Sequence, residues 1–485
     1  MAHQLPFQLH RPSIFKTQSW VNGSWIEAAS GKRFEITDND ANDVEAAVQA
    51  AHNAFLSYRK ISPRVRARCL LSWGTLIQEN KDDLAKIITH ETGKPIAEAL
   101  SELEYALNST WWFAGEADRI QGTLFDSSTP GKKVLTIKQP IGVVAALVPW
   151  NFPIAMVVRK AGAALAAGCT MVIKPSPETP LSVLTLALLA EEAGFPKGVL
   201  NILTTSLSNT PTLTEALCRH PLVKKVTFTG STRVGKLIAK ICSDGLKKVT
   251  LELGGNCPFI VFDDADLNEA AEALMGLKWR NAGQACISAN RVYVQSGVYD
   301  SFATILKDRT SKLVVGHGSS ATSTLGPVTT PQSLDRALAQ VEDAKKCGAR
   351  ILLGGDRVAN SSGYFFHPTI IADAKKEMRI TNEESFAPIL ALYKFETEEE
   401  AIQSANDTPM GLASYVFTKH LDRAWRLLDD LEAGMIGLNT SAITGAESPF
   451  GGMKESGYGK EAGKDVAVEE YLITKAASVA LGSRL

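Results

Sequence analysis

Long apolar runs are missing from the sequence. A membrane-spanning helix needs about 20 consecutive, mostly apolar residues. The longest apolar stretch, residues 141–167, is interrupted by prolines, by Asn151 and by the adjacent cations Arg159 and Lys160. We therefore expect no membrane span.

An excess of charge of one sign is missing as well. The chain has 51 Lys and Arg against 52 Asp and Glu, without a run of like charges. Proteins held to nucleic acid by phosphate contacts need a basic excess or a basic face. We expect neither nucleic acid nor a membrane as a partner.

Cysteine is scarce and scattered. The 485 residues include seven cysteines and no Cys-x-x-Cys pair, which argues against a disulfide scaffold, a zinc site or a dithiol redox centre. We expect no metal site and a reducing compartment. The cytoplasm is the first choice, and the mitochondrial matrix stays open because no acidic residue precedes Glu27.

Strand-like and helix-like segments alternate along most of the chain. Residues 19–34 alternate around an Asn-Gly turn and predict a hairpin, and the Ala, Leu and Ile spacing of residues 42–120 predicts helices. Between residues 141 and 254, β-branched runs alternate with Ala/Leu-rich runs, and a second block of this kind spans residues 258–439. This order predicts an α/β fold whose first block is a doubly wound, mostly parallel sheet.

Two strand-like segments lie outside both blocks. Residues 132–139 and 470–481 each have too few neighbouring strands to stand alone. Since an unpaired apolar strand edge promotes aggregation, we expect these segments to pair with each other or with another subunit.

A glycine-rich turn follows the strand-like residues 225–229. Residues 230–236 nearly match a phosphate-binding loop of nucleotide hydrolases, but Leu237 stands where that loop needs a hydroxyl. Gly230 and Ser231 remain at a strand-to-helix turn whose free amides could receive a pyrophosphate. An ordinary turn with a capping hydroxyl is the alternative.

The end of another strand bears on the choice of cofactor. Strands at this point usually end in an acidic residue that binds the ribose of NAD, but here Lys174 and Ser176 follow residues 171–173. They permit the extra phosphate of NADP, with a solvated lysine as the alternative. Residues 457–462 fit a loose dinucleotide fingerprint, but they follow a loop rather than a strand, and we reject them as a cofactor turn.

Two residues suggest chemistry. Glu252 is a lone carboxylate in an apolar strand, where burial would raise its pKa and prepare it as a base. Cys286 follows a loop of small residues that would leave a thiol open to a substrate. Taken singly, each could equally be a buried structural residue.

Six motifs occur in one order between about residues 19 and 480, and through them the chain resembles the aldehyde dehydrogenase superfamily, especially its succinate-semialdehyde dehydrogenase branch. They are Pro149-Trp150-Asn151-Phe152-Pro153, Phe228-Thr229-Gly230-Ser231, Leu251-Glu252-Leu253-Gly254-Gly255, Gly283-Gln284-x-Cys286, Glu384-x-Phe386-x-Pro388 and Pro449-Phe450-Gly451-Gly452.

The resemblance implies an aldehyde-dehydrogenase-like fold. A Rossmann-like NAD(P)-binding domain would comprise residues 1–121 and 141–254, and an α/β catalytic domain residues 255–460. A β-strand oligomerisation arm would comprise residues 122–140 and 461–485, and the assembly would be a homotetramer or homodimer.

The resemblance also implies the roles of individual residues. Cys286 would be the nucleophile, Asn151 an oxyanion donor and Glu252 the base. NAD or NADP would be bound by Trp150, Lys174, Ser176, Gly230, Ser231, Leu253, Glu384 and Phe386.

The implied substrate is a small aldehyde that carries a carboxylate, namely succinate semialdehyde. Arg159 and Arg280 match positions that bind the distal carboxylate, as a guanidinium fork does well, and Thr444 would be a third contact. Arg159 beside Lys160 could instead lie on a solvated helix face. Glutarate semialdehyde and general aliphatic or aromatic aldehydes are alternative substrates.

The chain departs from the family pattern in two places. Ser288 stands where related enzymes carry a second cysteine, so we expect no local dithiol switch. About a dozen residues of the pattern are absent after Glu35, which should remove an outer strand, expose a sheet edge and lower stability.

A catalytically weakened scaffold protein and a coenzyme-A-acylating enzyme are the competing functions. Glu252 disfavours the latter, since a thiol acceptor needs no base to release the acyl group.

Overall fold

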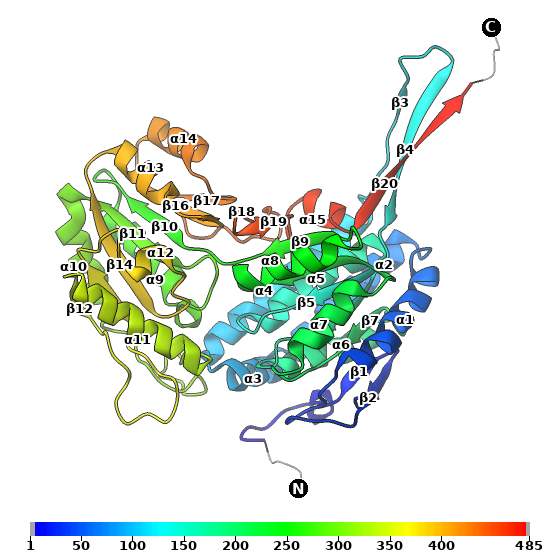
Figure 1. Ribbon diagram of the computed structural model, residues 1–485, viewed down its shortest axis with the longest axis horizontal. Helices are drawn as coiled ribbons and strands as arrows, with labels where there is room; N and C mark the ends of the chain where they lie inside the picture. Colours follow the sequence, from blue (N-terminus) through cyan, green and yellow to red (C-terminus); the bar gives the residue numbers. More distant parts are fainter. Residues whose placement is uncertain (1–4, 482–485) are drawn as a thin grey trace.

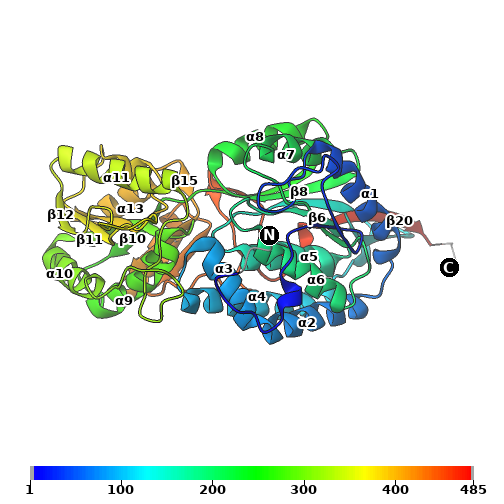
Figure 2. The same cartoon turned by 90° about the horizontal axis from the view of Figure 1, so that it is seen from below.

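The computed structural model describes residues 5–481. Two α/β lobes lie side by side, and a narrow arm projects from one of them (Figures 1 and 2). One lobe is built on an eight-stranded sheet, the other on a seven-stranded sheet, and the arm is a three-stranded sheet. We call them the eight-stranded lobe, the seven-stranded lobe and the arm.

The eight-stranded lobe contains η1 (Pro12–Ile14), β1 (Ser19–Val21), β2 (Ser24–Ile26), α1 (Ala41–Tyr58), α2 (Pro63–Glu79), α3 (Lys81–Thr92), α4 (Ile96–Ala117), β5 (Val143–Leu147), α5 (Pro153–Ala167), β6 (Thr170–Lys174), α6 (Pro180–Glu192), β7 (Leu200–Ile202), α7 (Thr210–Arg219), β8 (Val223–Thr229), α8 (Thr232–Ser243), β9 (Lys248–Glu252), β19 (Gly457–Tyr458) and α15 (Val466–Glu469).

The strand order of this lobe is β19-β9-β8-β5-β6-β7-β1-β2. Strands β5 to β9 are parallel to their neighbours within this group, which confirms the predicted doubly wound sheet. The predicted hairpin is confirmed as well, with Trp20 opposite Trp25. Helix α5 is buried at every residue, because it packs against the sheet on one side and against α2, α4 and α6 on the other.

The seven-stranded lobe contains β10 (Cys257–Val261), α9 (Leu267–Lys278), η2 (Arg280–Gly283), β11 (Ala289–Gln295), η3 (Ser296–Val298), α10 (Tyr299–Thr310), α11 (Pro331–Lys346), β12 (Arg350–Leu353), β13 (Thr369–Ala372), α12 (Arg379–Asn382), β14 (Ile389–Phe395), α13 (Glu398–Asn406), β16 (Ala413–Phe417), α14 (Leu421–Asp430) and β17 (Met435–Leu438). A small ribbon joins β15 (Met410–Gly411) to β18 (Met453–Lys454).

The seven-stranded sheet has the order β12-β13-β14-β11-β10-β16-β17 and is parallel except for β12. It confirms the second predicted α/β block. The sequence pattern gave no prediction for β13 or β17, each of only four residues, because so short a run shows little alternation.

The arm consists of β3 (Leu124–Asp126), β4 (Lys132–Pro140) and β20 (Leu472–Ala480). Strands β4 and β20 pair antiparallel along their full lengths, so the two segments without predicted partners pair with each other. Leu124 and Phe125 on β3 are 68% and 51% exposed. The role of the arm in subunit contacts and the predicted domain boundaries stay predictions, and residues 482–485 of that arm lie outside the described residues.

The shortened segment after Glu35 lies beside the outer hairpin. An isolated bridge joins Arg33 to Thr37, and the sheet ends at β2, with no strand of residues 5–481 paired to its outer side. The sheet thus ends at β2 within the described residues, while the loss of an outer strand, the newly exposed edge and the lower stability stay predictions.

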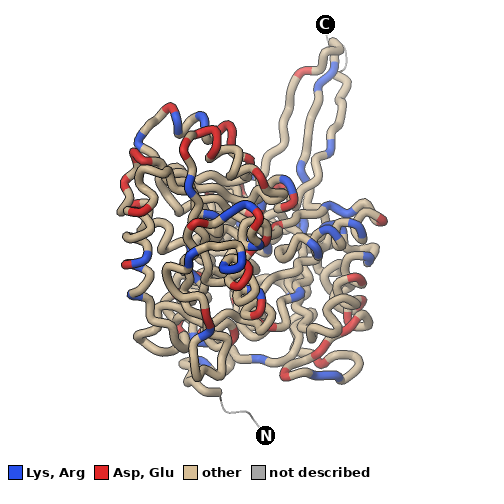
Figure 3. The backbone as a smooth tube through the Cα atoms, turned by 60° about the vertical axis from the view of Figure 1, so that its left-hand side comes forward, with Lys and Arg blue, Asp and Glu red and all other residues tan. Residues whose placement is uncertain are grey.

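Charged residues of both signs are mixed over both lobes (Figure 3). Among residues 5–481, no helix has the length and apolar character that crossing a bilayer requires.

Candidate active site

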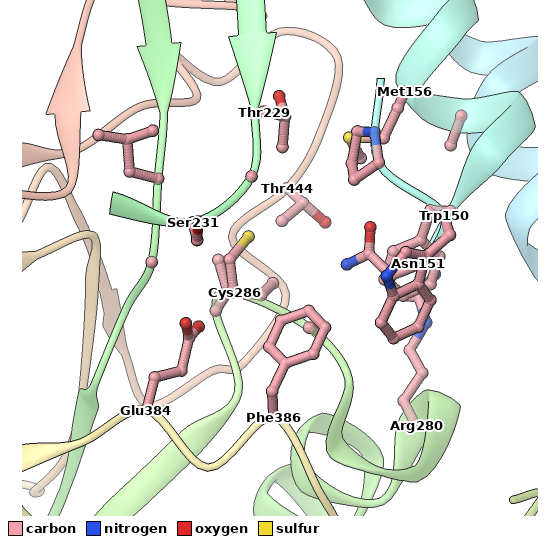
Figure 4. Close-up of a pocket in the computed structure, with 18 of the residues that line it drawn as sticks. Trp150, Asn151, Met156, Thr229, Ser231, Arg280, Cys286, Glu384, Phe386 and Thr444 are labelled. Atoms are coloured by element: carbon pink, nitrogen blue, oxygen red, sulfur yellow. The ribbon is translucent and has the colours of Figure 1, made fainter. Parts of the chain in front are cut away.

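A cavity of about 570 Å³ is lined by residues from both lobes. Most of the predicted site residues line it, and Figure 4 shows several of them. The predicted residues in its wall are Trp150, Asn151, Arg159, Gly230, Ser231, Leu253, Arg280, Cys286, Glu384, Phe386 and Thr444. Three other predicted residues are not part of its lining: Glu252, Lys174 and Ser176.

Cys286 follows a tight, left-handed turn. Asn281 and Ala282 both have φ of 51°, and Gly283 has φ of 73°. For residues other than glycine this conformation costs of order 1–3 kcal/mol each, and it persists only where neighbouring groups hold it. Gln284 does so by donating from Nε2 to the Asn281 carbonyl at 2.8 Å, while its Oε1 accepts from the Thr329 amide at 2.8 Å.

Asn151 lies opposite Cys286. Its Nδ2 donates to the Gln284 carbonyl at 3.0 Å, which leaves the second hydrogen of Nδ2 for the cavity. In Figure 4 the amide of Asn151 and the thiol of Cys286 face each other. No hydrogen bond within residues 5–481 uses the Cys286 backbone N–H. The two N–H groups can therefore stabilise a developing oxyanion together.

The surroundings of the Cys286 thiol favour its protonated form. Burial raises its pKa above the ordinary value, and the nearby Glu384 carboxylate adds to the shift. The thiolate, which is the nucleophile, forms only when the proton is removed.

Glu252 ends strand β9, and its side chain is buried. Neither carboxylate oxygen has a hydrogen-bond partner among residues 5–481. Burial raises the pKa of Glu252 well above its ordinary value, and Glu461 raises it further. The strand end lies against Cys286: a Cβ at Gly255 would come within 2.2 Å of the Cys286 carbonyl oxygen. Only glycine permits this approach, which brings the strand of the base to the nucleophile.

Arg159 and Lys160 are both buried, so the alternative of a solvated helix face is wrong. Arg159 donates to Glu461 Oε2 from Nε at 3.1 Å and from Nη2 at 2.9 Å, and its guanidinium lies 4.0 Å from the centre of the Phe450 ring. Lys160 binds the other oxygen of Glu461. Although burial alone would raise the pKa of Glu461, Lys160 and Arg159 hold it below the ordinary value.

Arg280 lies in the cavity wall with its charge unpaired. No carboxylate of residues 5–481 lies within 4.0 Å of its guanidinium, which lies 5.0 Å from the centre of the Phe152 ring. The Glu98 carboxylate interacts with this charge from a longer distance. In Figure 4, Arg280 lies on the Asn151 side of Cys286, away from Glu384 and Ser231. Arg280 is therefore the freer of the two predicted carboxylate ligands, and Thr444 lines the same cavity.

The opposite end of the cavity has groups that suit a dinucleotide. Ser231 is the N-cap of α8, and its side chain makes no capping hydrogen bond, so amides at this helix N-terminus are available for a phosphate. Glu384 accepts from the Gly255 amide at 3.2 Å, and burial raises its pKa to about 7. The Trp150 and Phe386 rings meet edge to face at 5.6 Å.

Lys174 ends β6, is 6% exposed, and has its pKa lowered to about 8 by burial. The alternative of a solvated lysine is therefore wrong. Ser176 donates to Glu178, which places a carboxylate beside the expected phosphate position. This arrangement of a buried cation, a hydroxyl and a free helix N-terminus fits a pyrophosphate and ribose.

The rejected glycine fingerprint has another role. Gly457 belongs to β19, which pairs with β9, and a Cβ on it would come within 1.9 Å of the Leu251 carbonyl oxygen. The glycine serves this close strand contact. Within the described part of the chain, no group of three or more His, Cys, Asp or Glu side chains could hold a metal ion.

The aldehyde dehydrogenase family model matches residues 26–477. The chain belongs to the aldehyde dehydrogenase family. The succinate-semialdehyde dehydrogenase [NADP(+)] 1 of Schizosaccharomyces pombe is 47% identical over 478 residues, 96% of this chain and 95% of the relative. The 3-sulfolactaldehyde dehydrogenase of Pseudomonas putida is 44% identical, and a glutarate-semialdehyde dehydrogenase of Pseudomonas putida is 43% identical, each covering 96% of this chain and 98% of the relative.

The fold is that of solved aldehyde dehydrogenases. The crystal structure of an aldehyde dehydrogenase from Brucella melitensis biovar abortus 2308 has a TM-score of 0.96 and 42% identity, with 98% of this chain and 100% of the other covered. A crystal structure of an E. coli NADP dependent enzyme has a TM-score of 0.95 and 42% identity, with the same coverage. The family's α/β fold, predicted from the motifs, is thereby confirmed.

Several residues of this aldehyde dehydrogenase site were not predicted. Tyr105 and Phe450 line the cavity, Gln284 braces the nucleophile turn, and Glu461 neutralises Arg159. Gln284 lies inside the motif Gly283-Gln284-x-Cys286, and its place next to the nucleophile was a signal that could have found it. Glu461 lies 302 residues from Arg159, and no spacing rule connects such a pair.

Proposed function

We propose that this aldehyde dehydrogenase oxidises succinate semialdehyde to succinate with NADP⁺ or NAD⁺. The observation that carries the proposal is the unpaired Arg280 guanidinium, which lies in the same cavity as Cys286 and Asn151. The three relatives described above are named for aldehydes that also bear an anionic group. A carboxylate on the substrate would form charge-assisted hydrogen bonds with Arg280 and hold the aldehyde near the thiol.

Cys286 releases its thiol proton to solvent, attacks the aldehyde carbon as a thiolate and forms a thiohemiacetal. The negative charge then develops on the former aldehyde oxygen, where Asn151 Nδ2 and the Cys286 backbone N–H stabilise it. Loss of a hydride from the same carbon leaves a thioester on Cys286. The nicotinamide dinucleotide, when bound, supplies the hydride acceptor for this oxidation.

Glu252 completes the reaction. It takes a proton from a water molecule, which adds to the thioester, releases the carboxylic acid and restores the thiol. Its raised pKa suits this role, because a carboxylate with no hydrogen-bond partner gains most from accepting a proton. A coenzyme-A-acylating reaction would have no use for this base.

Ser231, Lys174 and Ser176 would bind the phosphates of the dinucleotide, and Glu384 a ribose hydroxyl. A buried lysine favours an additional phosphate, as in NADP, whereas Glu178 beside Ser176 favours a ribose hydroxyl, as in NAD. Both cofactors therefore fit this set of groups.

A homotetramer or homodimer formed through the arm is part of the proposal. The exposed apolar residues Leu124 and Phe125 on strand β3 of the arm support this, since an apolar strand surface in water favours association. The reducing cytoplasm is the proposed compartment, in keeping with seven cysteines that are all free.

The test is nicotinamide reduction, followed at 340 nm, with succinate semialdehyde, glutarate semialdehyde, hexanal and benzaldehyde, each with NAD⁺ and NADP⁺. Cys286→Ala is the inactive control. We expect the acid aldehydes to have a kcat/KM at least about 10-fold above that of hexanal, the effect of one charge-assisted hydrogen bond. Glutarate semialdehyde is the second candidate, since it carries the same carboxylate one methylene further away. Equal use of hexanal would overturn the proposal.

A further inference from the structure

One face of helix α4 contacts both of the segments that supply the proposed oxyanion donors. Lys94 lies just before the helix, and Glu98 and Glu102 follow at intervals of four residues, so the three side chains lie on one side. None of them takes part in the chemistry proposed above.

Lys94 and Glu102 fix the backbone around Asn151. Both side chains have 0% exposure, and Lys94 Nζ donates to Glu102 Oε2 at 2.8 Å and to the Asn151 carbonyl at 2.7 Å. The other oxygen, Glu102 Oε1, accepts from the amides of Ile154 at 2.9 Å and Ala155 at 3.2 Å. It thus caps the first turn of α5, which begins two residues after Asn151.

Glu98 fixes the turn that carries Cys286. Its Oε2 accepts from the Asn281 amide at 2.8 Å, at the start of the left-handed segment. Asn281 Nδ2 in turn donates to the Asn151 carbonyl at 3.0 Å, the same atom that Lys94 binds. The two segments that supply the oxyanion donors are therefore tied to one helix and to each other.

We propose that Lys94, Glu98 and Glu102 are positioning residues that hold Asn151 Nδ2 and the Cys286 backbone N–H at the separation an oxyanion needs. This inference rests on the proposed roles of Asn151 and Cys286. A strained turn keeps its shape only when neighbouring groups fix it, and a misplacement of about 1 Å can cost about 100-fold in rate.

The test separates positioning from binding. Variants Lys94→Met and Glu98→Ala are compared with Glu98→Gln, which retains a carbonyl oxygen to accept the Asn281 N–H. Glu104→Gln, at a 60% exposed side chain on the outer face of α4, is the matched control. Circular dichroism and gel filtration report folding.

Two activities are measured for each variant. The first is aldehyde oxidation. The second is acylation of Cys286 by 4-nitrophenyl acetate, seen as release of 4-nitrophenolate, which uses the same oxyanion site but needs neither semialdehyde nor cofactor.

For Lys94→Met and Glu98→Ala we expect kcat of both activities to fall by about 10- to 100-fold, with KM for the cofactor within about threefold. KM for the semialdehyde is compared only in Lys94→Met, because the charge of Glu98 acts on Arg280. Glu98→Gln should retain most of the activity, and Glu104→Gln all of it.

Folded Lys94→Met and Glu98→Ala proteins that acylate at the wild-type rate would overturn the inference, and so would a change confined to KM. Equal loss in Glu98→Gln and Glu98→Ala would also contradict it. If Lys94→Met does not fold, the comparison of Glu98→Ala with Glu98→Gln decides. Glu98 is only part-buried, and its replacement leaves the ion pair between Lys94 and Glu102 in place. A wild-type protein that acylates but oxidises no semialdehyde would refute the proposed function and leave the positioning test valid.

Discussion

Replacing Arg280 with alanine should abolish the preference for acid aldehydes without impairing the chemistry. The Arg280 guanidinium has no carboxylate within 4.0 Å among residues 5–481, and its contact with the Phe152 ring is 5.0 Å from the ring centre. Its charge is thus free to bind a substrate, whereas that of Arg159 is already neutralised by Glu461. The substitution therefore removes the one unpaired cation on the Asn151 side of the described cavity wall.

The size of the effect follows from the kind of bond that is lost. A hydrogen bond to a charged group contributes about 1.5–3 kcal/mol, so kcat/KM for succinate semialdehyde should fall by about 10- to 150-fold. The value for hexanal should change by less than about threefold, because hexanal makes no such bond. Most of the loss should appear in KM, since the carboxylate is bound equally in the ground state and the transition state.

The assay is initial-rate nicotinamide reduction with both aldehydes, and Arg336→Ala is the control, since Arg336 also lines the cavity. If Arg280→Ala lowers the rates for hexanal and succinate semialdehyde equally, Arg280 supports the structure of the site and does not recognise the carboxylate. If it leaves both unchanged, the carboxylate is bound elsewhere.

Three further predictions concern the base, the cofactor and oxidation. In wild type, the rate of thioester hydrolysis should rise with pH through a value above the ordinary carboxyl pKa, because the charged form of Glu252 is the base and its pKa is raised. Glu252→Gln should remove that dependence, stop the reaction after a burst of about one equivalent of reduced cofactor, and lower kcat by about 10²- to 10⁴-fold. A raised folded-state pKa stabilises the fold below the unfolded pKa and loses that contribution as pH rises. In thermal unfolding, the Tm of Glu252→Gln should therefore exceed that of wild type by more at pH 8 than at pH 5. The same Tm difference between variant and wild type at both pH values would contradict this. Glu178→Gln should lower KM for NADP⁺ relative to KM for NAD⁺ by about fivefold, since a charge about 4 Å from a phosphate costs about 1 kcal/mol in water. A change in favour of NAD⁺ would refute the placement of the phosphate. Because Ser288 stands in place of a second cysteine, mild oxidant should not join Cys286 to a neighbouring cysteine through a disulfide. Mass spectrometry before and after dithiothreitol checks for such a bond.

The sequence predicts those parts of the site that depend on local motifs. Cys286 follows a run of small residues, and Glu252 interrupts an apolar strand, so both are visible in a short window. Their roles came from the family resemblance. The helix and strand order of the eight-stranded lobe was also accessible, because parallel strands and buried helices have strong apolar patterns.

The sequence does not predict which partners buried charges find. Residue spacing predicts a helix at α5, but it cannot show that Arg159 is buried and meets Glu461, which comes from the C-terminal region of the chain. The spacing of Lys94, Glu98 and Glu102 shows a shared helix face, but not that this face contacts Asn151 and Asn281. Such contacts depend on how elements distant in the sequence pack together, and local propensity does not encode that.

Strand β9 has consequences for the order in which the protein assembles during synthesis. Its end carries Glu252, and its outer side is paired by β19, which is made some 200 residues later. Glu461 and β20, which complete the charge cluster and the arm, come later still. Contacts so distant in sequence form slowly, and domains generally fold as they leave the ribosome, N-terminal part first. The nascent chain therefore carries an incomplete sheet edge, and the charge cluster beside Glu252 is completed only when the last tenth of the chain has been made.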